Sequence, residues 1–161
     1  MGEWFVVNVA EARAIAVEGS GAYVPFEPPG DRFPDYGINI QVLAPGEPNA
    51  QYHSESVQED FLVLAGECIA IVEDEELRLR AWDFLHCPAG TSHAFVGAGD
   101  GPCAILMVGA RQEGATVHYP VSEVAGRHGA SVRTPTDSPK EAYADWPQEY
   151  TETRLEWPPR R

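Results

Sequence analysis

The sequence FLVLAGECIAIVEDEELRLR, residues 61–80, contains three short runs separated by turn residues. The first two runs are apolar and meet at Gly66, and the acidic residues 73–76 separate the second run from residues 77–80, where leucine and arginine alternate. Runs of this length with a period of two are typical of β-strands, and an acidic turn between two of them predicts a hairpin. The stretch therefore predicts antiparallel β-structure.

The same pattern extends in both directions, from Gly37 to Ala110. Short apolar runs recur there and are separated by glycine, proline or acidic turns. Eight or so short strands without intervening helices indicate an all-β sandwich or barrel, and we assign residues 37–111 to this core. The further expected strands lie near residues 38–42, 51–55, 83–87, 94–96 and 104–108.

Residues 1–36 predict an N-terminal arm that packs on the barrel. A short strand is expected at residues 4–7 and a helical turn over residues 10–16. Residues 19–34 contain too many glycines and prolines for a helix and predict a loop. Its aromatic residues could anchor the arm on another surface.

Residues 112–161 predict a C-terminal extension with two short helices. Ser122 is expected to start the first helix, which ends near Gly126 or Gly129. Ser138, followed by Pro139, begins a capping-box pattern that predicts a helix over residues 139–146. The aromatic tail beyond it either packs as an extended clasp or waits for a second subunit, and the sequence does not choose between these alternatives.

The chain is strongly acidic, with 25 acidic and 11 basic residues and a net charge of −14. Such a surface repels phosphate backbones and anionic lipids, so we expect neither nucleic acid nor membrane partners. No apolar run approaches the roughly 20 residues that cross a bilayer, and no signal-peptide pattern is recognised. We therefore expect a cytoplasmic protein, whose three cysteines are reduced core thiols: Cys68, Cys87 and Cys103.

Two segments combine residue types that bind metals. In the first, His53 and Glu55 share one face of an expected strand, and Glu59 follows after a short irregular step. In the second, a Pro88-Ala89-Gly90 turn leads to His93 at the start of another strand. Gln51 has the same parity as His53, so we expect it in the same pocket.

These residues resemble the two motifs of the cupin superfamily of small β-barrels. The first motif, Gly then His-x-His, Glu and Gly, is represented by His53-x-Glu55, Glu59 and Gly66. The second, which contains Pro-x-Gly-x-x-His, is represented by residues 88–93. Glu55 replaces the second histidine of the first motif. The resemblance covers about residues 38–109 and implies a cupin-type double-stranded β-helix, a jelly-roll barrel like that of small bacterial single-domain cupins.

The resemblance implies that His53, Glu59 and His93 bind a divalent metal, with Glu55 in the position of a fourth ligand. Two imidazoles and a carboxylate suit Fe, Mn, Ni or Zn. Glu55 could instead stay unbound as a catalytic general base. His86 offers a further alternative, because it shares a strand face with Phe84 that could point inward and supply the missing histidine.

We expect a metal-dependent small-molecule enzyme, with oxygenase chemistry favoured over isomerase or lyase chemistry. The alternative is a non-catalytic module that binds a sugar or organic acid and has a degenerate or structural metal site. In a degenerate site, Glu55 would form a buried ion pair with His53 or His93. Because small cupins commonly pair, we also expect a homodimer.

Overall fold

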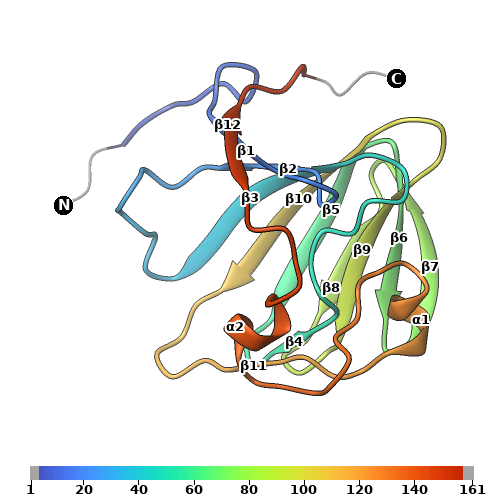
Figure 1. The fold of residues 1–161 in the computed structure, drawn as a ribbon. Helices are drawn as coiled ribbons and strands as arrows, with labels where there is room; N and C mark the ends of the chain where they lie inside the picture. The colour runs from blue at the N-terminus through green and yellow to red at the C-terminus, as the bar shows by residue number, and fades with distance from the viewer. Residues whose placement is uncertain (1–3, 158–161) are drawn as a thin grey trace.

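The computed structural model describes residues 4–157, which form β-sheets and two short helices (Figure 1). The largest sheet has seven strands in the order β12-β1-β2-β3-β10-β5-β8, and a second sheet has the order β7-β6-β9. A short pair, β4 with β11, completes the β-structure of these residues. The all-β fold with two short C-terminal helices is confirmed. The strands are β1 Ala14–Val17, β2 Ala22–Pro25, β3 Tyr36–Leu43, β4 Ser54–Glu55, β5 Glu59–Ala65, β6 Glu67–Val72, β7 Glu75–Arg80, β8 Phe84–Cys87, β9 His93–Ala98, β10 Cys103–Ala110, β11 Val117–His118 and β12 Tyr150–Thr153.

The hairpin expected from the alternating sequence is formed by β6 and β7, which pair in antiparallel register. Its acidic turn places Glu73 and Asp74 at φ values of 49° and 63°. Two consecutive residues with positive φ match the backbone twist of the flanking strands. The other edge of β6 pairs with β9, which carries His93 at its first residue.

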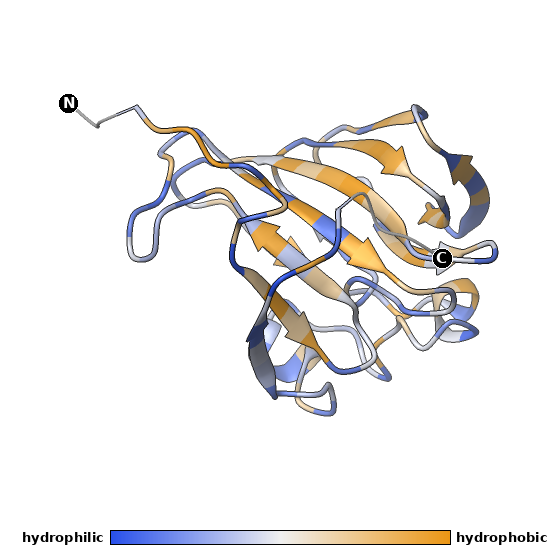
Figure 2. Cartoon of the chain, turned by 90° about the horizontal axis from the view of Figure 1, so that it is seen from above, coloured by the Kyte–Doolittle hydropathy of each residue, from blue (hydrophilic) through white to orange (hydrophobic). Residues whose placement is uncertain are grey.

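The core consists of apolar side chains from both large sheets. Phe61 and Val63 of β5 pack with Phe95 of β9 and Ile105 of β10, all nearly inaccessible to solvent. All three cysteines are buried and free, as expected for core thiols. In Figure 2, which is coloured by hydropathy, the strands are mainly hydrophobic and many connecting loops are hydrophilic.

The N-terminal expectations are wrong in three places. Residues 4–7 form no strand, and β1 begins at Ala14 where a helical turn was expected. Within the expected loop, residues 22–25 form β2, which pairs with β1 and β3. Local preference is overridden because these residues extend an existing sheet. The turn between β1 and β2 needs Gly21, where φ is 68° and a Cβ atom would lie 2.1 Å from the carbonyl oxygen of Val42.

At the C-terminal end, helix α1 spans Glu123–Gly126 and helix α2 spans Pro139–Ala142. Ser122 and Ser138 cap them as the sequence predicts, although α2 is shorter than expected. The tail forms a clasp on its own chain, since β12 pairs with β1. The last tail prolines, residues 158 and 159, lie outside the described residues.

Within residues 4–157, no helix is long and apolar enough to cross a membrane.

Candidate metal centre

The backbone brings the two histidine-bearing segments together. The N–H of His93 donates to the carbonyl oxygen of His53 at 2.8 Å, and the N–H of His53 donates to the carbonyl oxygen of His93 at 3.1 Å. This reciprocal pair places the two imidazole centroids 5.0 Å apart. The proximity of the rings is therefore set by a β-bridge and does not depend on flexible side chains.

Each imidazole is also oriented by a hydrogen bond at Nδ1. The acceptor is the carbonyl oxygen of Gln51 for His53, at 2.7 Å, and that of Thr91 for His93, at 3.1 Å. A carbonyl oxygen only accepts, so both Nδ1 atoms carry the proton. In the neutral rings, Nε2 then has a free lone pair, the form in which histidine binds metal ions.

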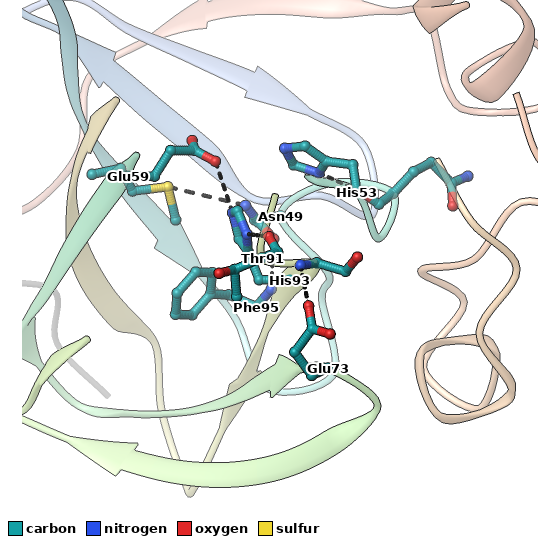
Figure 3. A network of polar contacts seen from close by, with 10 residues as sticks. Asn49, His53, Glu59, Glu73, Thr91, His93 and Phe95 are labelled. Carbon is teal, nitrogen blue, oxygen red and sulfur yellow. Dashed lines mark hydrogen bonds and ion pairs between the residues drawn. The ribbon is translucent and has the colours of Figure 1, made fainter. Parts of the chain in front are cut away.

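Glu59, the first residue of β5, supplies the carboxylate. Its Oε2 lies 3.2 Å from Nε2 of His93, yet it is buried and has no hydrogen-bond partner among the described residues. One ligand atom from each of His53, Glu59 and His93 lies within 4.8 Å of the others. Figure 3 shows the Glu59 carboxylate directed at the His93 ring. A buried, unpartnered carboxylate oxygen facing two imidazoles fits a bound divalent cation.

The electrostatics of the two histidines differ. Burial, and after it the neighbouring His93, lower the pKa of His53 below its usual value. Burial also lowers the pKa of His93, but the adjacent carboxylate of Glu59 outweighs this effect, so that the pKa of His93 is raised. A proton on Nε2 of His93 occupies the position where a cation would bind. Metal binding at this site would therefore displace that proton.

Glu55 lies beside this group without belonging to it. It is half-buried in β4 and lines the same cavity, but the three clustered ligand atoms do not include its carboxylate. Burial, followed by the negative charge of Glu59, raises the pKa of Glu55. The environment of Glu55 thus favours a carboxyl group that can exchange protons.

The cavity in front of these residues has a volume of about 240 Å³. Its lining includes polar side chains that the sequence interpretation missed, namely Asn39, Asn49 and Arg111. Asn39 alternates with two isoleucines in β3, so strand parity could have identified it. The side chain of Asn49 accepts a hydrogen bond from the N–H of Phe95 at 2.8 Å, a loop-to-strand contact without a local sequence signal.

Gln51 does not line this cavity. Its side chain is buried on the other side of the segment, while its carbonyl oxygen orients His53. The expectation that its side chain shares the pocket of His53 is wrong. Parity fails because the chain around His53 makes only an isolated bridge there and not a regular strand.

The inward orientation considered for His86 is also wrong. His86 is exposed and its Nδ1 contacts Oδ1 of Asp60 at 2.6 Å. Asp60 and His86 are paired residues of β5 and β8, and paired residues project to the same face of a sheet. Because the adjacent Glu59 projects into the barrel, His86 projects outward, as does Phe84, which is 63% exposed.

Comparison with protein families gives one match, in which residues 39–109 fit the model described as "Cupin domain". A search of curated proteins finds no match to the chain.

Many solved structures resemble the chain. One is a sugar phosphate isomerase of a cupin superfamily from Silicibacter pomeroyi. The aligned region includes 95% of this chain and 83% of that protein, with 20% identity and a TM-score of 0.54. Another is the polyketide cyclase RemF from Streptomyces resistomycificus. The aligned region includes 68% of this chain and 81% of RemF, with 16% identity and a TM-score of 0.59. The chain spans 65% of the length of a protein from Acidithiobacillus ferrooxidans. In that alignment 62% of this chain is matched, with 23% identity and a TM-score of 0.53. At these identities the likeness shows the fold alone, and it confirms the expected cupin-type jelly roll.

Proposed function

Because residues 39–109 match the model of a cupin domain, we propose that this chain is a metal-dependent enzyme acting on a small molecule inside the barrel. The observation that carries the proposal is the buried, unpartnered Oε2 of Glu59 beside two imidazoles whose Nδ1 atoms are already bonded. His53, Glu59 and His93 would hold the metal. These three donors suit Fe, Mn, Ni or Zn.

The donor set favours oxygenase chemistry over isomerase or lyase chemistry. Two histidines and one carboxylate are the set found in non-haem iron oxygenases. When bound, a divalent cation would polarise a substrate oxygen, and iron would in addition activate dioxygen. The identity of the metal therefore narrows the class of reaction.

Glu55 is the residue that we assign to proton transfer. Its raised pKa brings the carboxyl group closer to neutral pH, where a general acid or base is most effective. It lines the cavity with His53, so a substrate in the cavity would lie beside both residues. Asn39 and Asn49 offer amide groups that orient polar substrate atoms.

The size of the cavity favours a substrate of few atoms. Its volume of about 240 Å³ is below the roughly 300–1,000 Å³ of pockets that enclose drug-sized ligands. The lining contains both carboxylates and one arginine, and Arg111 is already paired with Glu27. A small polar substrate such as a sugar fragment suits this space best, and an organic acid would fit only if a bound cation offset the two carboxylates.

A non-catalytic binding module is the second candidate, and one observation favours it. Glu59 and His93 lie 3.2 Å apart as a buried ion pair, which raises the pKa of His93. A protonated His93 would neutralise Glu59 without a metal. In that case the barrel would bind its ligand without a metal ion, and the ligand would have no metal to coordinate.

Elemental analysis separates the two candidates. We would measure metal content by ICP-MS in protein purified without chelator or affinity metal. The proposal predicts near-stoichiometric Fe, Mn, Ni or Zn, which is lost in the His53→Ala, His93→Ala double variant and kept in His86→Ala, a matched change of an exposed histidine. A parent protein that lacks metal and resists reconstitution would favour the binding module.

A further inference from the structure

A second pocket, of about 390 Å³, lies between Gln51 and the C-terminal segment 129–146. Its lining does not include His53, Glu59 or His93, so it is separate from the candidate metal centre. The residues that matter for its chemistry are Gln51, Arg133, Thr136, Glu141, Asp145 and Trp146.

Gln51 forms the buried wall of this pocket and its amide is not satisfied. The residue is only 8% exposed, and its Oε1 has no hydrogen-bond partner among the described residues. Its backbone groups are used, because the N–H donates to the hydroxyl of Tyr143 and the carbonyl accepts from His53. A buried amide oxygen without a partner is costly, and a donor in the pocket would remove that cost. The terminal amide torsion is soft, so the oxygen can turn toward such a donor.

The opposite wall is held in place by hydrogen bonds and aromatic packing. The hydroxyl of Thr136 donates to Oε2 of Glu141 at 2.5 Å, and Ser138 caps the helix that carries Glu141. The ring of Trp146 packs edge to face against Tyr143, with centroids 5.6 Å apart. The carboxylate and the indole are therefore positioned before any ligand arrives, which lowers the entropic cost of binding.

The charges of the lining favour a cation. Glu141 and Asp145 contribute two carboxylates, against the exposed guanidinium of Arg133. The chain as a whole carries a net charge of −14, which attracts cations over a longer range. An indole face adds an apolar surface that also attracts positive charge.

From these features we infer that this pocket binds a small organic ammonium compound. Glu141 and Asp145 neutralise its charge, Trp146 packs against its carbon chain, and Gln51 accepts one of its N–H groups. The inference is independent of the proposed enzymatic function, because none of these side chains lines the candidate metal cavity.

The test is an NMR titration of the full-length, metal-free, ¹⁵N-labelled protein with three probes of equal length. These are n-butylamine, its neutral counterpart 1-butanol and the anion butyrate. The indole signal of Trp146 reports on the pocket and is assigned by its loss in Trp146→Phe. We expect n-butylamine alone to shift this signal saturably.

Charge variants give effects of opposite sign. The Glu141→Gln, Asp145→Asn double variant should bind n-butylamine at least about tenfold more weakly, since two charge-assisted contacts are lost. Arg133→Gln should strengthen binding because a repulsive charge is removed. Glu113→Gln, which changes an exposed acid outside the pocket, should leave the affinity unchanged. Equal shifts with 1-butanol, a preference for butyrate, unchanged affinity in the double variant, or no saturable shift at millimolar amine would each overturn the inference.

Discussion

Glu55 and Glu59 are close in sequence and occupy different positions at the candidate centre. The ligand atoms of Glu59 cluster with the two imidazoles, whereas Glu55 stands beside this cluster with a raised pKa. The residue types alone allow both carboxylates to bind the metal, and the geometry favours three ligands and a free fourth group.

This difference predicts unequal effects of two isosteric changes. Glu59→Gln removes the anionic donor and should weaken metal affinity by more than about 10–100-fold, the range known for outer-sphere changes. Glu55→Gln should keep the metal within about tenfold of the parent. Competition with a fluorescent chelator measures both affinities. If Glu55→Gln lost the metal as completely as Glu59→Gln, Glu55 would be a ligand.

Asn49 shows how one side chain joins the cavity to the core. Its Oδ1 accepts the hydrogen bond from the N–H of Phe95, a residue with no exposed surface. Asn49→Ala leaves that N–H without a partner and should lower the free energy of unfolding by about 1–3 kcal/mol. Urea denaturation followed by circular dichroism tests this. A change below about 0.5 kcal/mol would mean that water replaces the lost acceptor.

At the scale of elements, the loop between β2 and β3 is tied to the end of β10 near the cavity. The guanidinium of Arg111 donates to both carboxylate oxygens of Glu27 and to the carbonyl oxygen of Phe33. The N–H of Phe33 also donates to Glu27. One acidic residue thereby organises a loop that has no regular secondary structure.

This contact predicts a pH-dependent contribution to stability. The hydrogen bond from Arg111 lowers the pKa of Glu27 below its ordinary value of 4.5. The stabilisation is therefore fully present above pH 4.5 and is lost as the pH falls through the lower pKa of the folded state. Wild type and Glu27→Gln should differ most in unfolding free energy near neutral pH and converge in acid, as measured by urea titrations at several pH values. A difference that stays constant from neutral pH into acid would contradict this assignment.

Helix α1 depends on a single buried cap. The hydroxyl of Ser122 accepts from the N–H of Ala125 and donates to Asp74 in the β6–β7 turn. Ser122→Ala should destabilise the protein by about 1–2 kcal/mol, because a cap and a charge-assisted bond are lost together. Ser138→Ala, at the more exposed cap of α2, should cost less, about 0.5–1 kcal/mol. Thermal denaturation of the two variants compares them directly, and equal losses would show that the contact with Asp74 adds nothing.

At the scale of the whole molecule, the C-terminal tail closes the large sheet against its own N-terminal strand. β12 pairs with β1 over four residues, and Leu155 packs on a cluster that contains Ala14 and Val24. The clasp therefore joins the first and last strands of the described chain (Figure 1).

A chain that ends at Glu149 should lose this clasp. We expect the free energy of unfolding to fall by roughly 2–4 kcal/mol, similar to the loss of a large buried side chain. Sedimentation equilibrium on the full-length and truncated chains tests a separate prediction, that of a homodimer. We expect the full-length chain to sediment as a dimer. An unchanged stability after truncation would mean that the pairing of β12 with β1 contributes little in solution.

The sequence by itself determined the barrel, the hairpin at residues 67–80 and the two helix caps. These features depend on local physics: a period of two, turn residues, and serine side chains that bond to nearby N–H groups. His53, Glu59 and His93 could be chosen as candidates because their types and spacing resemble family motifs.

Only the tertiary structure decided how these residues are used. The β-bridge that joins His53 to His93, the outward position of His86 and the contact between Asn49 and Phe95 link residues far apart in the chain. The strands β1, β2 and β12 form because partner strands supply hydrogen bonds, a condition that local preference does not encode. The physical reason is the same throughout, since spacing sets which face a residue occupies, whereas pairing between distant segments sets what that face meets.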